Sequence, residues 1–144
     1  MFATRAVVKL RQAGLKRELG YQSNNLATYH FKLGNNELAR QFLLEASQCF
    51  PHDDQSWHWV LLQNGAYSKG VAGDYQAAAR LIGFLDKRFR DRGEPRQSTE
   101  EMQRSEILSL IDEALEPDEL VGLMREGENL GPFEADYFAG FSPA

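Results

Sequence analysis

Apolar residues recur at intervals of three and four along most of the chain, which is the spacing of one face of an α-helix. Representative sets are Leu38, Phe42 and Ala46; Ala78, Leu81 and Leu85; and Ile107, Ile111 and Leu115. The alternation of apolar and polar residues that is typical of strands does not persist in these blocks. Five prolines and glycine-containing turns near residues 20, 34, 73, 93 and 131 separate blocks of helical length. The pattern therefore predicts an all-α protein of about seven helices.

The chain also matches itself at a shift of 39 residues. The shift places Asn25 on Asn64, Ala27 on Ala66, Gly34 on Gly73 and Ala39 on Ala78. We expect each glycine at a turn that needs a left-handed backbone, and the second alanine of each set where two helices approach closely. The sequence thus predicts two related helical hairpins, the first of them ended by Pro51, which cannot continue a helix.

The stretch 26–51, LATYHFKLGNNELARQFLLEASQCFP, resembles a tetratricopeptide repeat in the spacing of its small and apolar residues and of its glycine turn. By this resemblance, residues 20–51 form a first repeat and residues 52–93 a degenerate second one, in which Gly65 replaces a large apolar residue. Residues 1–19 look like the second helix of a truncated earlier repeat, and residues 97–144 are expected to form capping helices. The resemblance implies one domain, 1–144, built as a right-handed stack of antiparallel helix hairpins, an α-α superhelix.

A second resemblance, over residues 20–130, is to the C-terminal helical repeat region of large bacterial signal-transduction ATPases and transcription regulators of the LuxR and adenylate-cyclase-linked type. It rests on a GD-x3-AARL-x-G segment, a G-x-P-R turn followed by T-E, and an EG-x-x-L ending. The matching residues are Gly73, Asp74, Ala78, Ala79, Arg80, Leu81, Gly83, Gly93, Pro95, Arg96, Thr99, Glu100, Glu126, Gly127 and Leu130. The resemblance implies a regulatory or interaction segment, because the nucleotide-binding and DNA-binding parts of that family lie elsewhere in longer chains.

In stacked helical hairpins the first helix of each pair lines the concave face, where ligands bind. The tetratricopeptide resemblance places six residues on or beside that face: Tyr21, Asn24, Thr28, Lys32, Gln63 and Tyr67. The set is polar and aromatic, which suits an extended peptide. Chaperone-binding members hold a C-terminal carboxylate with a lysine and an asparagine, but those places hold Asn24 and Thr28 here, so we do not expect that ligand. The alternative is that the six residues are ordinary exposed helix surface.

The C-terminal segment 131–144 holds more aromatic residues than a solvated tail usually exposes, namely Phe133, Tyr137, Phe138 and Phe141. Three of them recur at four-residue spacing and would share one face of a helix. We expect a short helix that caps the open end of the stack, or alternatively a surface for self-association.

Composition and charge narrow the function classes. The single cysteine, Cys49, can form neither an internal disulfide nor a cysteine-based zinc site, and it fits a reducing cytoplasm. No apolar run approaches the roughly 20 residues of a membrane span, so we expect a cytoplasmic protein without membrane contact.

The net charge of −5 conceals a gradient along the chain, because residues 1–20 carry +4 and residues 100–144 carry −10. Such asymmetry can orient a partner, although charged helix residues are more often a solvated face.

One group of residues has the composition of a metal site: His52, Asp53, Asp54 and His58. Two imidazoles with carboxylates can bind a transition metal. However, Asp53 and Asp54 follow a proline and precede an apolar helix, which is where carboxylates cap a helix. We therefore expect capping, and we expect neither a metal nor any other cofactor.

The remaining candidates for chemistry are isolated. Cys49 and His30 are expected to be packed side chains rather than catalytic groups. The acidic pairs of the C-terminal third are expected to be solvated or in the first turns of helices. The cations between residues 80 and 96 are interrupted by Asp86, Asp91 and Glu94, so we expect no direct nucleic-acid binding.

The sequence thus predicts a non-catalytic domain that binds a protein or peptide, or senses a ligand, within a bacterial signalling or transcription regulator. A homodimer formed through the aromatic C-terminus or the open repeat face is the alternative. An enzyme that uses His30, Cys49 or the acidic helices is a third hypothesis, which no convergent motif supports.

Overall fold

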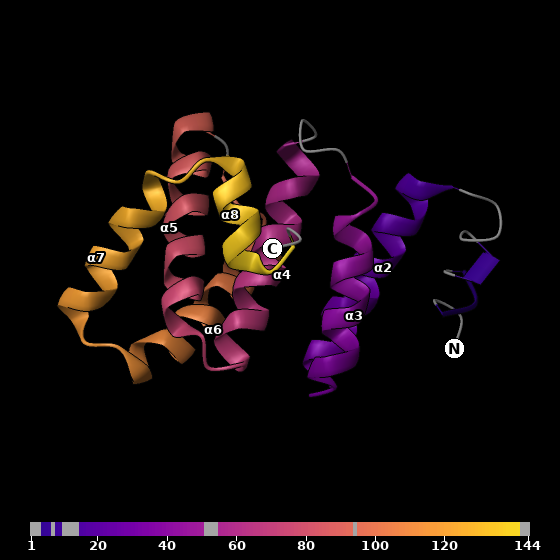
Figure 1. The fold of residues 1–144 in the computed structure, drawn as a ribbon, viewed down its shortest axis with the longest axis horizontal. Helices are drawn as coiled ribbons and strands as arrows, with labels where there is room; N and C mark the ends of the chain where they lie inside the picture. Colours follow the sequence, from indigo (N-terminus) through magenta and orange to yellow (C-terminus); the bar gives the residue numbers. More distant parts are fainter. Residues whose placement is uncertain (1–3, 7, 10–14, 51–54, 94, 142–144) are drawn as a thin grey trace. The chain divides into compact units, whose positions relative to one another are not determined.

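The computed structural model describes residues 4–6, 8–9, 15–50, 55–93 and 95–141, and within these residues the regular structure is entirely helical. The prediction of an all-α protein is therefore confirmed. The helices labelled in Figure 1 are α2 (Lys16–Lys32), α3 (Asn36–Ser47), α4 (Gln55–Val71), α5 (Tyr75–Arg92), α6 (Ser98–Ala114), α7 (Pro117–Glu128) and α8 (Pro132–Ala139). Pro51, expected to end a helix, lies outside the described residues.

The chain forms two compact units, residues 1–64 and residues 65–144, and the boundary falls inside α4. The first unit contains α2, α3 and the first part of α4. The second contains the end of α4 and α5 to α8. The assignment of residues 1–144 to one right-handed superhelical stack stays a prediction.

In the first unit, α2 and α3 form a helical hairpin. The turn between them depends on Gly34, whose φ of +80° is a left-handed conformation that glycine adopts without strain. The Gly34 amide donates to the Phe31 carbonyl and the Asn35 amide to the His30 carbonyl, which satisfies the last carbonyls of α2. Ala27 and Ala39 are fully buried. The predicted left-handed turn is confirmed, and both alanines lie in the core of the hairpin.

The turn expected near Gly20 is wrong, because Gly20 lies inside α2. A Cβ at this position would lie 2.5 Å from Cε2 of Phe50 and 2.9 Å from the Cβ of Cys49. The glycine therefore gives the Phe50 ring room to pack against the helix. Composition alone could not distinguish this packing role from a turn.

In the second unit, α5 is the central helix and packs against α6, α7 and α8 (Figure 1). It begins after Gly73, whose φ is +87°, and ends at Gly93, whose φ is +71°. The Oδ1 of Asp74 caps the helix by accepting from the Ala77 amide at 3.2 Å. Every residue from Ala77 to Leu85 except Arg80 is buried, so α5 has an apolar surface on several sides. This apolar surface allows α5 to pack against α6, α7 and α8 at the same time.

Two glycines allow α5 and α7 to cross almost in backbone contact. A Cβ at Gly83 would lie 2.0 Å from the carbonyl oxygen of Met124, and a Cβ at Gly127 would lie 1.9 Å from that of Arg80. No side chain could occupy either place without moving a helix. Both glycines belong to the motif that carries the second family resemblance, so in this chain the motif has a direct packing role.

A third glycine, Gly65 in α4, faces α8. A Cβ there would lie 2.9 Å from the Cβ of Ala139 and 3.2 Å from Cζ of Phe141. The large apolar residue that is usual at this repeat position would collide with the C-terminal segment. The glycine at this position thus has a physical reason, which is the close packing of α8.

Candidate functional site

The six residues expected on a concave face differ in exposure and belong to different units. Tyr21, Asn24, Thr28, Lys32 and Gln63 lie in the first unit and Tyr67 in the second. Lys32 is exposed, whereas Tyr21, Thr28 and Tyr67 are half-buried. Asn24 and Gln63 are buried, the former with only 4% of its surface exposed. These two side chains are therefore not part of the exposed surface.

Two of the expected residues meet in a buried polar network. Nδ2 of Asn64 donates to Oδ1 of Asn24 at 2.8 Å and to Oγ1 of Thr28 at 3.0 Å. The Thr28 hydroxyl donates in turn to the Asn24 carbonyl at 3.2 Å. Asn64 was expected to match Asn25 of the first repeat, but Asn64 is buried and Asn25 is exposed. The network links α2 to the first part of α4, which is a structural role.

The candidates for chemistry have ordinary surroundings. His30 is buried, stacks on Phe42 with ring centroids 5.7 Å apart, and lies 3.3 Å from Nδ2 of Asn35 through its Nδ1. It is a packed and hydrogen-bonded histidine, as predicted. The half-buried Cys49 donates its thiol to the Glu45 carbonyl at 3.3 Å.

The proposed metal group falls largely outside the described residues, because His52, Asp53 and Asp54 are not among them, while His58 is buried. Within the described residues no three His, Cys, Asp or Glu side chains are grouped so that they could hold a metal ion. The acidic pair Asp118 and Glu119 lies in the first turn of α7, as expected.

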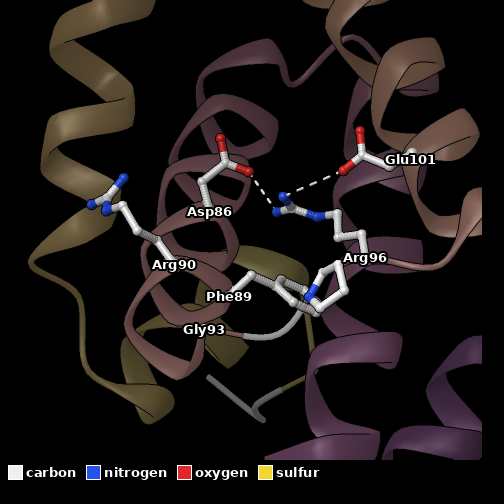
Figure 2. Close-up of a pocket in the computed structure, with 7 residues that line it drawn as sticks. Asp86, Phe89, Arg90, Gly93, Arg96 and Glu101 are labelled. Carbon is white, nitrogen blue, oxygen red and sulfur yellow. Dashed lines mark hydrogen bonds and ion pairs between the residues drawn. The ribbon is translucent and has the colours of Figure 1, made fainter.

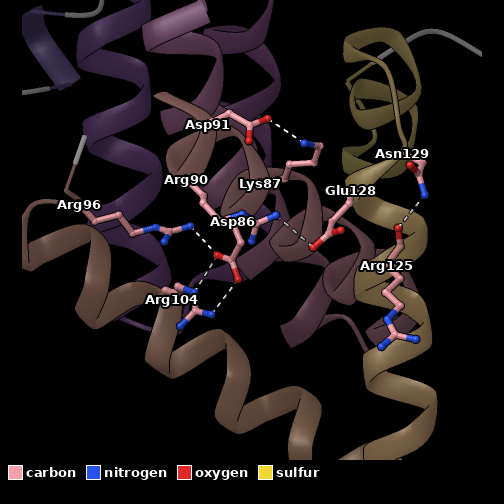
Figure 3. Close-up of polar contacts among 9 residues, drawn as sticks. All are labelled: Asp86, Lys87, Arg90, Asp91, Arg96, Arg104, Arg125, Glu128 and Asn129. Carbon is pink, nitrogen blue, oxygen red and sulfur yellow. Dashed lines mark hydrogen bonds and ion pairs between the residues drawn. The ribbon is translucent and has the colours of Figure 1, made fainter. Parts of the chain in front are cut away.

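Four cations of α5 contact groups of α5, of α7 and of the segment that follows α7, and Figure 3 shows two of them, Lys87 and Arg90. Arg80 pairs with Glu126 at 2.9 Å, Lys87 with Asp91 at 2.8 Å, and Arg90 with Glu128 at 3.4 Å. Arg88 donates to the Leu130 carbonyl at 2.9 Å and its guanidinium lies over the Phe84 ring. These four cations therefore have partners within the second unit.

One cavity of the second unit, of about 620 Å³, lies where α5 meets the segment before α6 (Figure 2). Asp86 is its central charge, and it accepts from Arg96 and, in a two-pronged contact at 2.8 and 2.9 Å, from Arg104. Arg96 also stacks on the Phe89 ring at 4.4 Å and lies 3.7 Å from Glu101. The charged groups around Asp86 are thus already paired with one another. We call the contacts of Asp86 with Arg96 and Arg104 the clamp between α5 and α6, because they join α5 to α6 and to the segment before it.

A second cavity, of about 390 Å³, is lined by the end of α4, the start of α5 and by α8, and we call it the α8 cavity. Its lining includes Lys69, Asp74, Arg80, Tyr137, Phe138 and Gly140. The Tyr137 and Phe138 rings meet edge to face at 5.6 Å, and the Arg80 guanidinium lies 5.0 Å from the centre of the Phe138 ring. Phe138 is half-buried and lies next to the Arg80 guanidinium, whereas Tyr137 lines the cavity and is exposed to solvent.

The aromatic C-terminus forms a helix as predicted, but its rings do not all share one surface. Phe133 and Tyr137 lie on exposed turns of α8, with 68% and 64% of their surfaces exposed. Phe141 follows the left-handed Gly140 that ends α8, and it packs towards Gly65 instead. The exposed aromatic surface of the second unit is therefore Phe133 and Tyr137, and the α8 cavity adjoins it.

The cations of the α8 cavity were not among the expected partner-binding residues. Arg80 belongs to the motif of the second family resemblance and to the interrupted basic series, and neither pattern predicts a binding role for Arg80 or for Lys69. Their approach to Tyr137 joins residues far apart in the chain, and no local pattern of residue types encodes such a contact. The helix boundaries could be predicted from local spacing, whereas this cavity could not.

Comparison with models of protein families, with curated protein sequences and with solved structures finds no match to this chain. Within the described residues, no helix combines the length and the apolar character that crossing a membrane requires.

Proposed function

We propose that the chain is a non-catalytic protein-interaction domain of a bacterial signalling or transcription regulator in the cytoplasm, and that α8 carries its binding surface. One observation carries the proposal: Phe133 and Tyr137 expose about two thirds of their surfaces on one helix, beside a cavity. Exposed aromatic side chains are costly in water and are enriched at protein interfaces. The two family resemblances, to interaction and regulatory segments, support the same class of function.

The surface fits a short peptide segment better than a large flat partner. Tyr137 offers a ring with a polar tip, and the neighbouring cavity of about 390 Å³ can take one anchoring side chain. Such anchors, set in a pocket beside an aromatic residue, usually supply most of the binding free energy. The buried Asn24 and Gln63 leave the surface expected in the first unit with fewer accessible groups.

A library of random peptides displayed on phage and panned against the whole chain tests this proposal. Enriched peptides are synthesised, and their dissociation constants are measured by calorimetry for the wild type, Tyr137→Ser and Met102→Ser. Met102, 64% exposed on α6, is a matched control of equal exposure. We expect at least about a tenfold loss of affinity in Tyr137→Ser and none in Met102→Ser. Enrichment of no peptide, or equal binding by Tyr137→Ser, contradicts the proposal.

The second candidate function is self-association through the same surface, because two aromatic surfaces of this kind can cover each other in a symmetric dimer. Light scattering over a range of concentrations distinguishes the two. A wild-type dimer that becomes a monomer in Tyr137→Ser but not in Met102→Ser supports the second candidate. A monomer at every concentration rejects it.

A further inference from the structure

Resting on the proposed function, we propose that the α8 cavity selects acidic partner segments. Lys69 and Arg80 bind an Asp or Glu side chain of the partner there, while Tyr137 packs against an adjacent apolar side chain. The proposal names the chemical class of the partner, and it rests on the charges that the cavity brings together.

The cavity holds two cations and one carboxylate, and that carboxylate is engaged in the fold. Oδ1 of Asp74 accepts from the Ala77 amide as the cap of α5. The carboxylate therefore holds the helix start and does not neutralise Lys69 through an ion pair. Arg80 is already balanced by Glu126, with which it pairs at 2.9 Å. Lys69 is thus the cation of the cavity that makes no ion pair within the described residues.

Lys69 is the cation that a partner can reach. Within the described residues it makes no ion pair, and it is half-buried in the last turn of α4. Its Nζ lies 3.6 Å from the place that a Cβ on Gly140 would occupy, so the ammonium group is directed at the end of α8. A half-buried ammonium group that makes no ion pair is a favourable place for a carboxylate.

Arg80 supplies a second, fixed charge. Its Nε donates to Glu126, and its guanidinium plane packs near Phe138, so the side chain is held in place before any partner binds. An arginine that is held in this way loses little conformational entropy on binding. Arg80 lines the same cavity as Lys69, and its charge there is shared with Glu126.

The α8 cavity and the larger cavity around Asp86 differ in how their cations are paired. There Arg96 and Arg104 share Asp86, and Arg90 pairs with Glu128. An incoming carboxylate would have to break ion pairs of the fold at that place. In the α8 cavity it meets Lys69, which makes no ion pair within the described residues.

The chain as a whole carries a net charge of −5, so its long-range field repels acidic peptides and attracts basic ones. A preference for acidic peptides therefore cannot come from the overall charge. Such a preference has to come from cations close to the bound peptide. Tighter binding of acidic than of neutral peptides would therefore distinguish the local charge of the cavity from the net charge of the chain.

Synthetic peptides of one scaffold test the inference, each with a central leucine flanked by glutamates, by glutamines or by lysines. Their binding to the whole chain is measured by fluorescence polarisation. We expect the glutamate peptide to bind at least about fivefold more tightly than the glutamine peptide, and this preference to shrink as salt is added. Lys69→Glu should abolish the preference and Lys69→Gln should reduce it. Lys16→Glu, the same charge reversal at an exposed position of α2, should leave it intact.

Three results overturn the inference. The first is equal binding of the glutamate and glutamine peptides; if that binding still depends on Tyr137, the proposed function stands alone. The second is a preference that survives Lys69→Glu in a variant whose thermal unfolding matches the wild type. The third is binding of no peptide, which together with a failed phage selection also rejects the proposed function.

Discussion

At the scale of single residues, the glycines of this chain have different roles that their type does not reveal. Gly34 and Gly73 provide left-handed turns, whereas Gly83 and Gly127 allow two backbones to touch. The turn glycines could be predicted, because a repeat of polar and small residues surrounds them. The contact glycines lie inside helices, where local sequence gives no reason for them, and only the packing of α5 on α7 explains them.

The first prediction concerns this contact. Gly83→Ala and Gly127→Ala each place a Cβ about 2 Å from a carbonyl oxygen of the facing helix, so the helices must separate. We expect each to lower the free energy of unfolding by about 2–3 kcal/mol. Gly122→Ala is the control, because nothing lies within 4 Å of its Cβ. That change should stabilise the protein by about 0.5–1 kcal/mol through helix propensity. Urea unfolding measures all three, and a neutral Gly83→Ala contradicts the close crossing.

The second prediction concerns Tyr67. Burial raises the pKa of its hydroxyl above the ordinary value of 10.0, and the negative charge of Glu106 adds to the effect. The unfolded chain ionises this tyrosine first, so its contribution to stability is complete below about pH 10 and is lost as the pH rises through the raised pKa. Absorbance at 295 nm should show one late-titrating phenol, and Tyr67→Phe should remove that phase. A wild-type titration with all five tyrosines alike contradicts the prediction.

At the scale of elements, charge pairs organise the second unit more than the sequence indicated. The sequence predicted that the cations of α5 are a basic series interrupted by acids, and that the acids of the C-terminal third are solvated or in the first turns of helices. In the structure several of these groups are partners, as Arg80 with Glu126 and Arg90 with Glu128. The pairing could not be predicted, because the register of α7 against α5 is set by glycine contacts distant in sequence.

The third prediction tests the clamp between α5 and α6. Asp86→Ala removes the carboxylate that Arg96 and Arg104 share and leaves two mostly buried cations side by side. We expect a loss of about 2–3 kcal/mol in the free energy of unfolding. Asp91→Ala removes a carboxylate from the exposed pair with Lys87 and should leave the melting temperature nearly unchanged. Equal melting temperatures for the two variants contradict the clamp.

The C-terminal segment shows how much of a local structure the spacing of aromatic residues predicts. The four-residue recurrence of aromatic residues correctly predicted a helix, now α8 over Pro132–Ala139. It also placed Phe141 on the face of Phe133 and Tyr137, which is wrong because α8 ends at Gly140 with a φ of +82°. A glycine in the left-handed conformation redirects the chain, so Phe141 packs towards Gly65.

At the scale of the whole molecule, the fold class could be predicted from the local pattern of residues, whereas the α8 cavity could not. Helical periodicity and left-handed glycines are encoded within a few residues of one another. The α8 cavity joins the end of α4, the start of α5 and a helix more than fifty residues later. The sequence predicted the aromatic residues Tyr137 and Phe138 as a possible contact surface, but their approach to Lys69 and Arg80 depends on tertiary packing and could not be predicted.

The central claim, that partners bind at α8, is tested most directly by hydrogen–deuterium exchange of the whole chain with and without a selected peptide. We predict slower exchange in residues 69–80 and 132–140 when the peptide is bound, with α2 unchanged. The same protection should be absent in Tyr137→Ser at the same peptide concentration. Protection confined to α2 and the first part of α4 would contradict the account and return the binding surface to Tyr21, Thr28 and Lys32.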